Sequence, residues 1–183
     1  MRHKRKTVLS VWRYVCSERR HIMSTITVER VDYANPQHAQ TLVDLLDAYA
    51  QDPMGGGHAL DTDVKQRLIP ELAARPWAYS VVAWDGDVAV GLINALEGFS
   101  TFAAKPLVNV HDVTVLPSHR GRGIAARMLA EVESIARQRG ACKLTLEVLS
   151  GNTSAAKAYE RVGFELYALD PEAGTAQFMQ KWL

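Results

Sequence analysis

The amino-acid sequence predicts an α+β domain built on one mixed, mostly antiparallel sheet of about seven strands, with four helices beside it. Two observations lead to this fold class. Three strand-like segments follow one another at 79–84, 88–99 and 107–115, and the short turns between them are typical of an antiparallel meander. After residue 115 the hydrophobic period becomes helical, and a helix, a strand, a second helix and two final strands complete the order.

The segment before the meander predicts one strand and two helices. Residues 25–31 alternate as a strand. Asn35 followed by Pro36 is typical of a helix start, and an apolar stripe follows it at Leu42, Leu45, Leu46 and Tyr49. Three consecutive glycines at 55–57 end this helix, so we expect a mobile loop there. A second, short helix is expected to reach Ala74, with Asp61 or Asp63 as its cap.

Turn signals and helical periodicity define the remaining elements. Asp85-Gly86, between two alternating segments, is a strong hairpin signal. Apolar residues at helical spacing from Ile124 to Ala136 predict an amphipathic helix that Gly140 ends. The other expected elements are a strand at Lys143–Leu149, a helix at Thr153–Val162, and strands at Phe164–Leu169 and Ala176–Trp182.

Composition restricts the class of protein. With 183 residues, 48% of them hydrophobic and 22% charged, the chain suits one soluble domain, which we expect over residues 23–183. No stretch reaches the roughly 20 apolar residues that a bilayer-crossing helix needs, so we expect no membrane partner. Cys16 and Cys142 do not form a disulfide framework, which favours a cytoplasmic location. The six histidines show no paired ligand spacing, so no metal is expected.

Basic charge is concentrated at the N-terminus. Residues 1–22 hold seven Lys or Arg and one Glu, a formal charge of +6, which leaves −5 on residues 23–183. That acidic body argues against a nucleic-acid partner. The apolar run in the tail is too short for a secretory signal, because Arg13 interrupts it. We expect residues 1–22 to be a disordered basic tail or an extension from an upstream start codon.

A glycine-rich turn carries the functional signal. His119 to Ala126 lies between a strand and an amphipathic helix and contains Arg120, Gly121, Arg122 and Gly123. The first N–H groups of a helix have no intrahelical acceptor, and glycines let an anion approach the backbone. Hydrogen bonds to a charged oxygen contribute about 1.5–3 kcal/mol each, against about 0.3–1 kcal/mol for the helix dipole. The turn therefore predicts a phosphate site, although the two glycines would also suit a tight turn with no ligand.

A dinucleotide is an alternative ligand for the phosphate site predicted at this turn. Gly121-x-Gly123-x-x-Ala126 fits the dinucleotide fingerprint, and Glu147 follows at about the distance expected of its acidic residue. Two features weaken this reading. The first glycine should directly follow a strand, whereas residues 116–120 intervene, and an antiparallel meander precedes the turn in place of βαβ units.

Two motifs resemble the GNAT acetyltransferase superfamily. Arg120-x-x-Gly123-x-Ala125 resembles its R/Q-x-x-G-x-G/A acyl-CoA pyrophosphate loop, with Ala125 where many members have glycine. Residues 152–164 resemble its N-x-x-A-x-x-x-Y-x-x-x-G-F segment. The resemblance covers residues 24–183 and includes the element order. It implies a GNAT-like sheet whose two central strands, 107–115 and 143–149, splay apart, and it suggests a homodimer.

The resemblance also implies a cofactor and its contacts. Acetyl-CoA would lie in the splay, with its pantetheine amides on the backbone of Val113 and Val115. An N–H group near Val113 would polarise the thioester carbonyl. The remaining expected contacts with coenzyme A are Arg120, Gly121, Arg122, Gly123, Ile124, Ala125, Asn152, Ala156 and Tyr159.

Transfer of an acetyl group to an amine needs an acid and a base. By the resemblance, Tyr159 is the general acid that protonates the departing thiolate, unless its ring only packs beneath the cofactor. His111 is the first candidate for the base, because an imidazole has a suitable pKa and the superfamily often places Glu or His nearby. Asp112, on the opposite sheet face, and Glu97 are its competitors. A histidine simply hydrogen-bonded in the sheet is the alternative reading of His111.

The acceptor is predicted to be a small cationic amine. Acidic residues and the negative body charge favour a cation, and 99–102 with 110–112 is weakly similar to small-amine and polyamine acetyltransferases. Ordinary surface charges would explain the same acids. A protein N-terminus or lysine as acceptor, and an acyl-CoA-binding module without catalysis, also remain open. The candidate acceptor residues are Asp52, Gly56, His58, Phe99, Phe102 and Glu147.

Overall fold

The computed structural model describes residues 25–167, 172, 174 and 176–182. In this part of the chain one sheet has the strand order β1-β2-β3-β4-β5. The pairs β1–β2, β2–β3 and β3–β4 are antiparallel, and β5 runs parallel to β4. The strands are β1 (Ile26–Arg30), β2 (Ala78–Asp85), β3 (Val88–Ser100), β4 (Lys105–Val115) and β5 (Leu144–Leu146).

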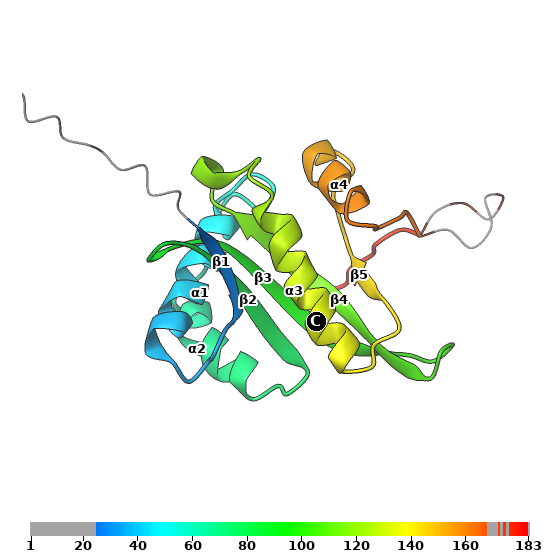
Figure 1. Cartoon of the computed structure of the whole chain (residues 1–183), viewed down its shortest axis with the longest axis horizontal. Helices are drawn as coiled ribbons and strands as arrows, with labels where there is room; N and C mark the ends of the chain where they lie inside the picture. The colour runs from blue at the N-terminus through cyan, green and yellow to red at the C-terminus, as the bar shows by residue number, and fades with distance from the viewer. Residues whose placement is uncertain (1–24, 168–171, 173, 175, 183) are drawn as a thin grey trace, which may run out of the picture.

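Helices cover both faces of the sheet (Figure 1). Helices α1 (Pro36–Ala50) and α2 (Thr62–Ala73) pack on one face, and α3 (Ile124–Gln138) crosses the other. A 3₁₀ turn, η1 (Pro117–His119), precedes α3, and α4 (Thr153–Glu160) follows β5 and contacts α3. The α+β class and the four helices predicted from the sequence are therefore confirmed.

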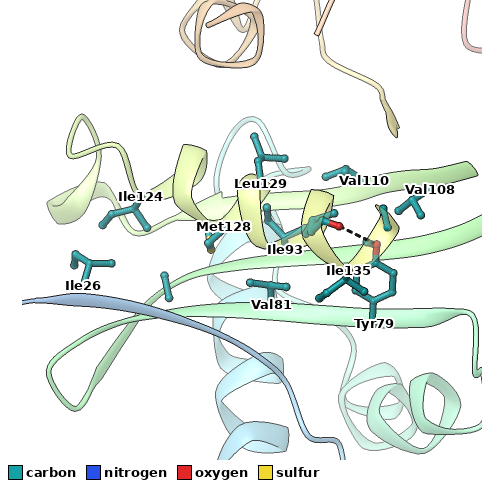
Figure 2. Packing of buried hydrophobic residues seen from close by; sticks show 14 of the residues in the cluster. Ile26, Tyr79, Val81, Ile93, Val108, Val110, Ile124, Met128, Leu129 and Ile135 are labelled. Atoms are coloured by element: carbon teal, nitrogen blue, oxygen red, sulfur yellow. Dashed lines mark hydrogen bonds between the residues drawn. The ribbon is translucent and has the colours of Figure 1, made fainter. Parts of the chain in front are cut away.

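The core has two parts, one on each face of the sheet. Under α3, Met128 lies over Val81 and Ile93 of the sheet (Figure 2). Met128 and Val132 of this helix are both fully buried. Under α1 and α2, Leu42 meets Leu92 and other apolar side chains. Burial of each such side chain contributes about 1.5–3 kcal/mol. Because both faces are covered, β2 is buried from Ala78 to Trp84 and does not show the polar alternation of a half-exposed strand.

Local sequence signals explain where the elements begin and turn. Asn35 caps α1, since its Oδ1 accepts from the N–H of Gln37 at 2.9 Å, and Pro36 is the first helical residue. The hairpin at Asp85-Gly86 joins β2 to β3, with Gly86 at a φ of 61°. Gly140 follows the end of α3 at a φ of 75°. Each of these features was predicted from the sequence.

The prediction of seven strands was wrong, because the described residues form five. The expected strand at 143–149 shrinks to the three residues of β5. No strand is assigned to 164–167 or 176–182, while residues 168 and 169 lie outside the described part. Phe178, Met179 and Trp182 are 77–87% exposed. Alternating side chains indicate which face a strand would bury, but a strand also needs a partner edge, and such a short β5 provides little of one.

Two other expectations concern the ends of the chain and membranes. The predicted basic tail at 1–22 lies outside the described residues. Within the described ranges, none of the helices combines the length and apolar character needed to cross a bilayer.

Candidate functional site

The site is built around an irregularity in β4. In the β3–β4 register Ala95 faces Val110 while Asn94 faces Asp112, so His111 is an extra residue, a β-bulge. The parallel pairing between β4 and β5 ends at Val110 with Leu146, one residue before this bulge. The two strands therefore part where the bulge bends β4.

The parting leaves one edge of β4 open. From Asp112 to Val115 the strand pairs with β3 alone, whereas 108–110 pair with strands on both sides. Main-chain N–H and C=O groups on the open edge need other partners, and an extended chain of amides is a suitable one. Val113 and Val115 pack half-buried against the core under α3. All three residues of β5 pair with β4, so the structure shows an unpaired edge of β4 beyond the bulge, and the splay of the two strands stays a prediction.

The glycine-rich turn lies at the end of this open edge. Gly121 and Gly123 have φ values of 77° and 74°, which favour glycine, and a Cβ added to either would meet no atom within 4 Å. Gly123 is the N-cap of α3 and has no side chain with which to cap the first turn. The N–H groups of Ile124 and Ala125 therefore begin the helix beneath open space, an arrangement suited to a phosphate group.

Both arginines of this turn are already paired with carboxylates. Arg120 donates through Nη2 to Asp52 Oδ2 at 2.8 Å and through Nε to the carbonyl of Val115 at 3.0 Å. Arg122 donates through Nη1 to Asp85 Oδ2 at 2.9 Å. The arginines thus fasten the turn to two neighbouring segments, and the main-chain N–H groups are its most direct donors toward an anion.

Asp52 lies on the loop after α1 and is joined to the glycine turn by Arg120. Its side chain accepts from the N–H of Met54 at 2.9 Å, and the N–H of His58 returns to the carbonyl of Ala50 at 3.1 Å, so the loop folds back on the helix end. The Arg120 guanidinium beside Asp52 holds the pKa of that carboxyl below its usual range. A pocket of about 200 Å³ opens here, lined by Ala48, Gln51, Asp52, Thr114, Leu116, Pro117 and Arg120.

Two tyrosines, one from α1 and one from α4, are half-buried near each other. Tyr159 of α4 is half-buried against Phe164, and burial raises its pKa to about 12. Proximity to Tyr49, at the end of α1, contributes to the same shift. Burial also raises the pKa of Tyr49, and the charges of Asp112 and Asp52 raise it further. Tyr49 therefore lies near the two acids and Tyr159 at once.

The three candidate bases have different surroundings. Asp112 is half-buried and its Oδ2 accepts from Asn94 Nδ2 at 2.9 Å. His111 is exposed, with Nδ1 3.4 Å from Asn109 Oδ1. Glu97 pairs with Arg139 at 3.1 Å, near the C-terminal end of α3 and so at the other end of that helix from the glycine turn. The structure brings Asp112 and His111 to the parting of β4 and β5, and it does not bring Glu97 there.

Of the remaining predicted residues, some lie near the end of the β4–β5 pairing or near Asp52, and others lie far from both. Glu147 accepts from Asn109 Nδ2 at 3.1 Å beside the parting, and Asn152 caps α4 through the N–H of Ala155, one residue before Ala156. Gly56 and His58 are exposed on the loop that holds Asp52. Phe99 and Phe102 are 63% and 103% exposed at the tip of the β3–β4 hairpin, at the end of β4 remote from the glycine turn. The hairpin tip does not join the pocket near Asp52.

Two residues of the site were missed in the sequence analysis. Tyr49 was assigned only to the apolar stripe of its helix, and Asn94 was not singled out. The signal for Tyr49 was its place at the end of a helix, just before the glycine-rich loop at 55–57. The signal for Asn94 was a polar residue within the apolar run of 90–96.

Comparison with known proteins agrees with this geometry. Residues 39–164 match the acetyltransferase (GNAT) family. Streptothricin acetyltransferase of Streptomyces lavendulae is 40% identical over 86 residues, 45% of this chain and 46% of that protein. Aminoglycoside N(6')-acetyltransferase type 1 of Salmonella typhimurium is 28% identical over 89 residues, 47% of this chain and 61% of its own length. These matches therefore span about half the length of the curated relatives.

Solved structures share the whole fold. AAC(6')-Iy, in complex with the bisubstrate analogue CoA-S-monomethyl-acetylneamine, superposes with a TM-score of 0.69 at 21% identity, covering 87% of this chain and all of that one. An α+β sheet that parts beside a glycine-rich helix start defines the GNAT class of fold. The chain belongs to the acetyltransferase (GNAT) family.

Proposed function

We propose that this protein is an acetyl-CoA-dependent N-acetyltransferase that acetylates a primary amine of a small cationic acceptor, by direct attack in a ternary complex. The observation that carries the proposal is the open edge of β4, which begins at the His111 bulge and ends at the glycine turn. An amide-bearing arm fits along this edge, and a diphosphate fits at its end.

The residues present suit coenzyme A. Open space above Gly121 and Gly123 admits a phosphate, and the N–H groups of Ile124 and Ala125 supply donors. Val113 and Val115 supply main-chain partners for the pantetheine amides. Asn152 and Ala156, at the start of α4, are further proposed contacts with coenzyme A. Arg120 and Arg122 hold the turn in place. Acetyl-CoA contributes an acetyl group activated as a thioester.

Tyr159 is the proposed acid. Because burial raises its pKa to about 12, the phenol keeps its proton at any physiological pH. A thiol has a pKa of about 8.5, below that of the buried phenol, so the proton moves to sulfur only as the thiolate forms, and the phenolate then regains a proton from solvent. Tyr159 donates that proton to sulfur as the carbon–sulfur bond breaks.

Asp112 is the proposed base. It takes the proton that the amine loses as the amine nitrogen bonds to the acyl carbon, directly or through a water molecule. Asp112 is half-buried and held by Asn94, whereas His111 is exposed. Two further observations favour Asp112 over Glu97. Its carboxylate lies near Tyr49, which in turn lies near Tyr159, and no guanidinium is paired with it among the described contacts. Glu97 is occupied by Arg139.

A cationic amine is the proposed acceptor. Arg120 neutralises much of the charge of Asp52, so Asp112 is the carboxylate that favours an ammonium group near Tyr49. The residues from 23 onward have a formal charge of −5, which attracts cations from solution. The names of the relatives, streptothricin and aminoglycoside acetyltransferases, support an acceptor with several amino groups.

The test is turnover with a panel of amines. Release of free thiol from acetyl-CoA is measured with an aminoglycoside, a polyamine and a lysine-containing peptide. We expect turnover with the aminoglycoside or the polyamine, and a decrease of about 10²-fold in kcat for Asp112→Asn. Turnover with the peptide alone would exclude a small acceptor. Binding of acetyl-CoA without turnover of any amine would favour a module without catalysis.

Ligand binding is tested separately by thermal shift. We expect acetyl-CoA to raise the Tm and NAD to leave it unchanged. The opposite result would overturn the proposal, because the glycine turn would then be a dinucleotide site.

A further inference from the structure

A row of buried polar side chains crosses the sheet and ends at Asp112. In the register of β2 and β3, Ser80 faces Asn94, and in that of β3 and β4, Asn94 faces Asp112. Ser80 Oγ donates to Asn94 Oδ1 at 2.6 Å, and Asn94 Nδ2 donates to Asp112 Oδ2 at 2.9 Å. The hydroxyl of Tyr33, on the loop after β1, lies 2.9 Å from Ser80 Oγ.

The hydrogen bonds of the row have one direction. Ser80 has a single hydroxyl hydrogen and gives it to Asn94, so Tyr33 must be the donor to Ser80. Burial raises the pKa of Tyr33, which keeps the hydrogen that it donates. Asn94 has its carbonyl toward Ser80 and its amino group toward Asp112. Every donor in the row therefore points toward the carboxylate of Asp112.

Stability alone does not require this row. Ser80 is fully buried and Asn94 is 5% exposed, on a face where Val82 and Leu92 are also buried. In the described part of the chain, Thr114 is the one other polar residue of the same burial class. Replacing both partners of a buried hydrogen bond by apolar groups of the same shape is often nearly neutral for stability. A buried polar row that ends on a half-buried carboxylate is better explained by its effect on the orientation of that carboxylate.

The bulge in β4 connects Asp112 to the row. If the pairing beyond Ala95 and Val110 continued regularly, without a bulge, Asn94 would face His111, and Asp112 would lie opposite Ile93, on the other face of the sheet. The same irregularity that opens the edge of β4 thus aligns Asp112 with Asn94.

We propose that Asn94, held by Ser80 and Tyr33, is a positioning residue that fixes the carboxylate of Asp112 in the acceptor site. This inference rests on the function proposed above. Asn94 holds Oδ2 of Asp112 and leaves Oδ1 for the ammonium group or for a water molecule. The row orients the carboxylate and does not carry protons, because an amide between a hydroxyl and a carboxylate does not pass a proton along.

The test is a double-mutant cycle between Asn94 and Asp112. We expect Asn94→Ala to lower kcat by about tenfold, because the carboxylate loses its fixed orientation. The KM for acetyl-CoA stays unchanged, because the cofactor edge of β4 is not altered. In the Asp112→Asn background, Asn94→Ala should have less than about a twofold further effect. An equal decrease in both backgrounds, or a raised KM for acetyl-CoA, would overturn the inference.

Three further variants separate positioning from folding. Ser80→Ala should lower kcat in the same sense but less, and Tyr33→Phe less again, since each lies one bond further from Asp112. Val82→Ala is the matched control, because Val82 is buried on the same strand and face as Ser80 but outside the row. It should lower the Tm without changing kcat. A decrease in kcat for Val82→Ala equal to that for Asn94→Ala would show that the effect is structural.

A measurement without turnover keeps this inference separate from the proposed function. In ¹⁵N-labelled protein, the side-chain amide signal of Asn94 should move when Asp112 is replaced by Asn, because the acceptor of its hydrogen bond loses its charge. An unchanged signal would overturn the row even if the protein acetylates amines. A moved signal in a protein without acetyltransferase activity would support the row and refute the proposed function.

Discussion

The glycine turn and the pocket beside Asp52, which is the proposed acceptor site, differ in how they are assembled. The turn is one contiguous segment, 120–125, and its shape follows from two glycines with positive φ and a helix start. The pocket combines the end of α1, the loop after it and β4, and Asp112, two residues before Thr114 on β4, depends on side chains from β2 and β3. A contiguous site can be recognised from a motif, whereas an assembled site depends on strand register.

One ion pair connects the two regions. Arg120 belongs to the glycine turn by sequence, but its guanidinium pairs with Asp52 of the pocket at 2.8 Å. Exposed ion pairs contribute little to stability. We therefore infer that this pair aligns the two regions with each other more than it stabilises the fold. The predictions below separate the two regions, beginning with the largest expected effect.

Loss of the proposed acid should affect chemistry alone. Tyr159→Phe should lower kcat by about 10²-fold, because no group then donates a proton to the departing sulfur. The Kd for coenzyme A, measured by calorimetry, should not change. Tyr167→Phe is the matched control, since that tyrosine is exposed and outside the site. An unchanged kcat in Tyr159→Phe would remove this residue from the mechanism.

A methyl group in the glycine turn should affect cofactor binding alone. Gly123→Ala strains a residue at a φ of 74° by about 1 kcal/mol, and its Cβ enters the space where a phosphate would lie. We expect the Kd for acetyl-CoA to rise about tenfold with kcat at saturation nearly unchanged. Gly140→Ala carries the same strain at the other end of α3, at a φ of 75°. It should lower the Tm equally and leave this Kd unchanged; equal Kd changes in both variants would refute the phosphate site.

Removal of the connecting ion pair should have a smaller effect on both regions. Asp52→Asn should raise the KM for the amine, and that for acetyl-CoA, by about threefold each, because Arg120 then holds neither segment firmly. Asp63→Asn is the control, since it breaks a comparable exposed pair with Arg67 on α2. If only the KM for the amine changed, the pair would not align the two regions.

The same pair predicts a pH dependence of stability. Its guanidinium partner lowers the pKa of Asp52 in the folded protein, so the stabilisation is complete above the unfolded pKa of about 3.9. It is lost as the pH falls through the lower, folded pKa. The difference in Tm between the wild type and Asp52→Asn should therefore be constant from pH 7 to about 5 and vanish in stronger acid. A difference that changed near pH 7 would contradict this assignment.

The smallest effect is spectroscopic. Burial raises the pKa of Tyr159 to about 12, so its ionised form is disfavoured in the folded protein. Stability from this group is complete below the unfolded pKa of about 10 and is lost as the pH rises toward 12. In an ultraviolet titration, Tyr159→Phe should remove a component near pH 12 and leave the earlier phenol ionisations unchanged. Loss of a component near pH 10 would contradict the burial.

Sequence patterns predicted the features that depend on neighbouring residues. The cap at Asn35, the turn at Gly86 and the glycine turn before α3 follow from local backbone preferences, and the structure has all three. Tertiary structure decided the features that depend on distant residues. The guanidinium of Arg120 pairs with a loop 68 residues away, which no local pattern indicates.

The bulge in β4 shows most clearly what could not be predicted from the sequence. An alternating strand specifies two faces, but one inserted residue exchanges them for everything beyond it. The sequence therefore suggested His111 as the base, with Asp112 on the opposite face and Glu97 as competitors, and the pairing of Asp112 with Asn94 is what favours Asp112 in the proposed mechanism. The sequence determined which chemical groups are available and where the chain turns. Packing of the sheet decided which of those groups meet, because register is set by the whole set of strand contacts and not by any one segment.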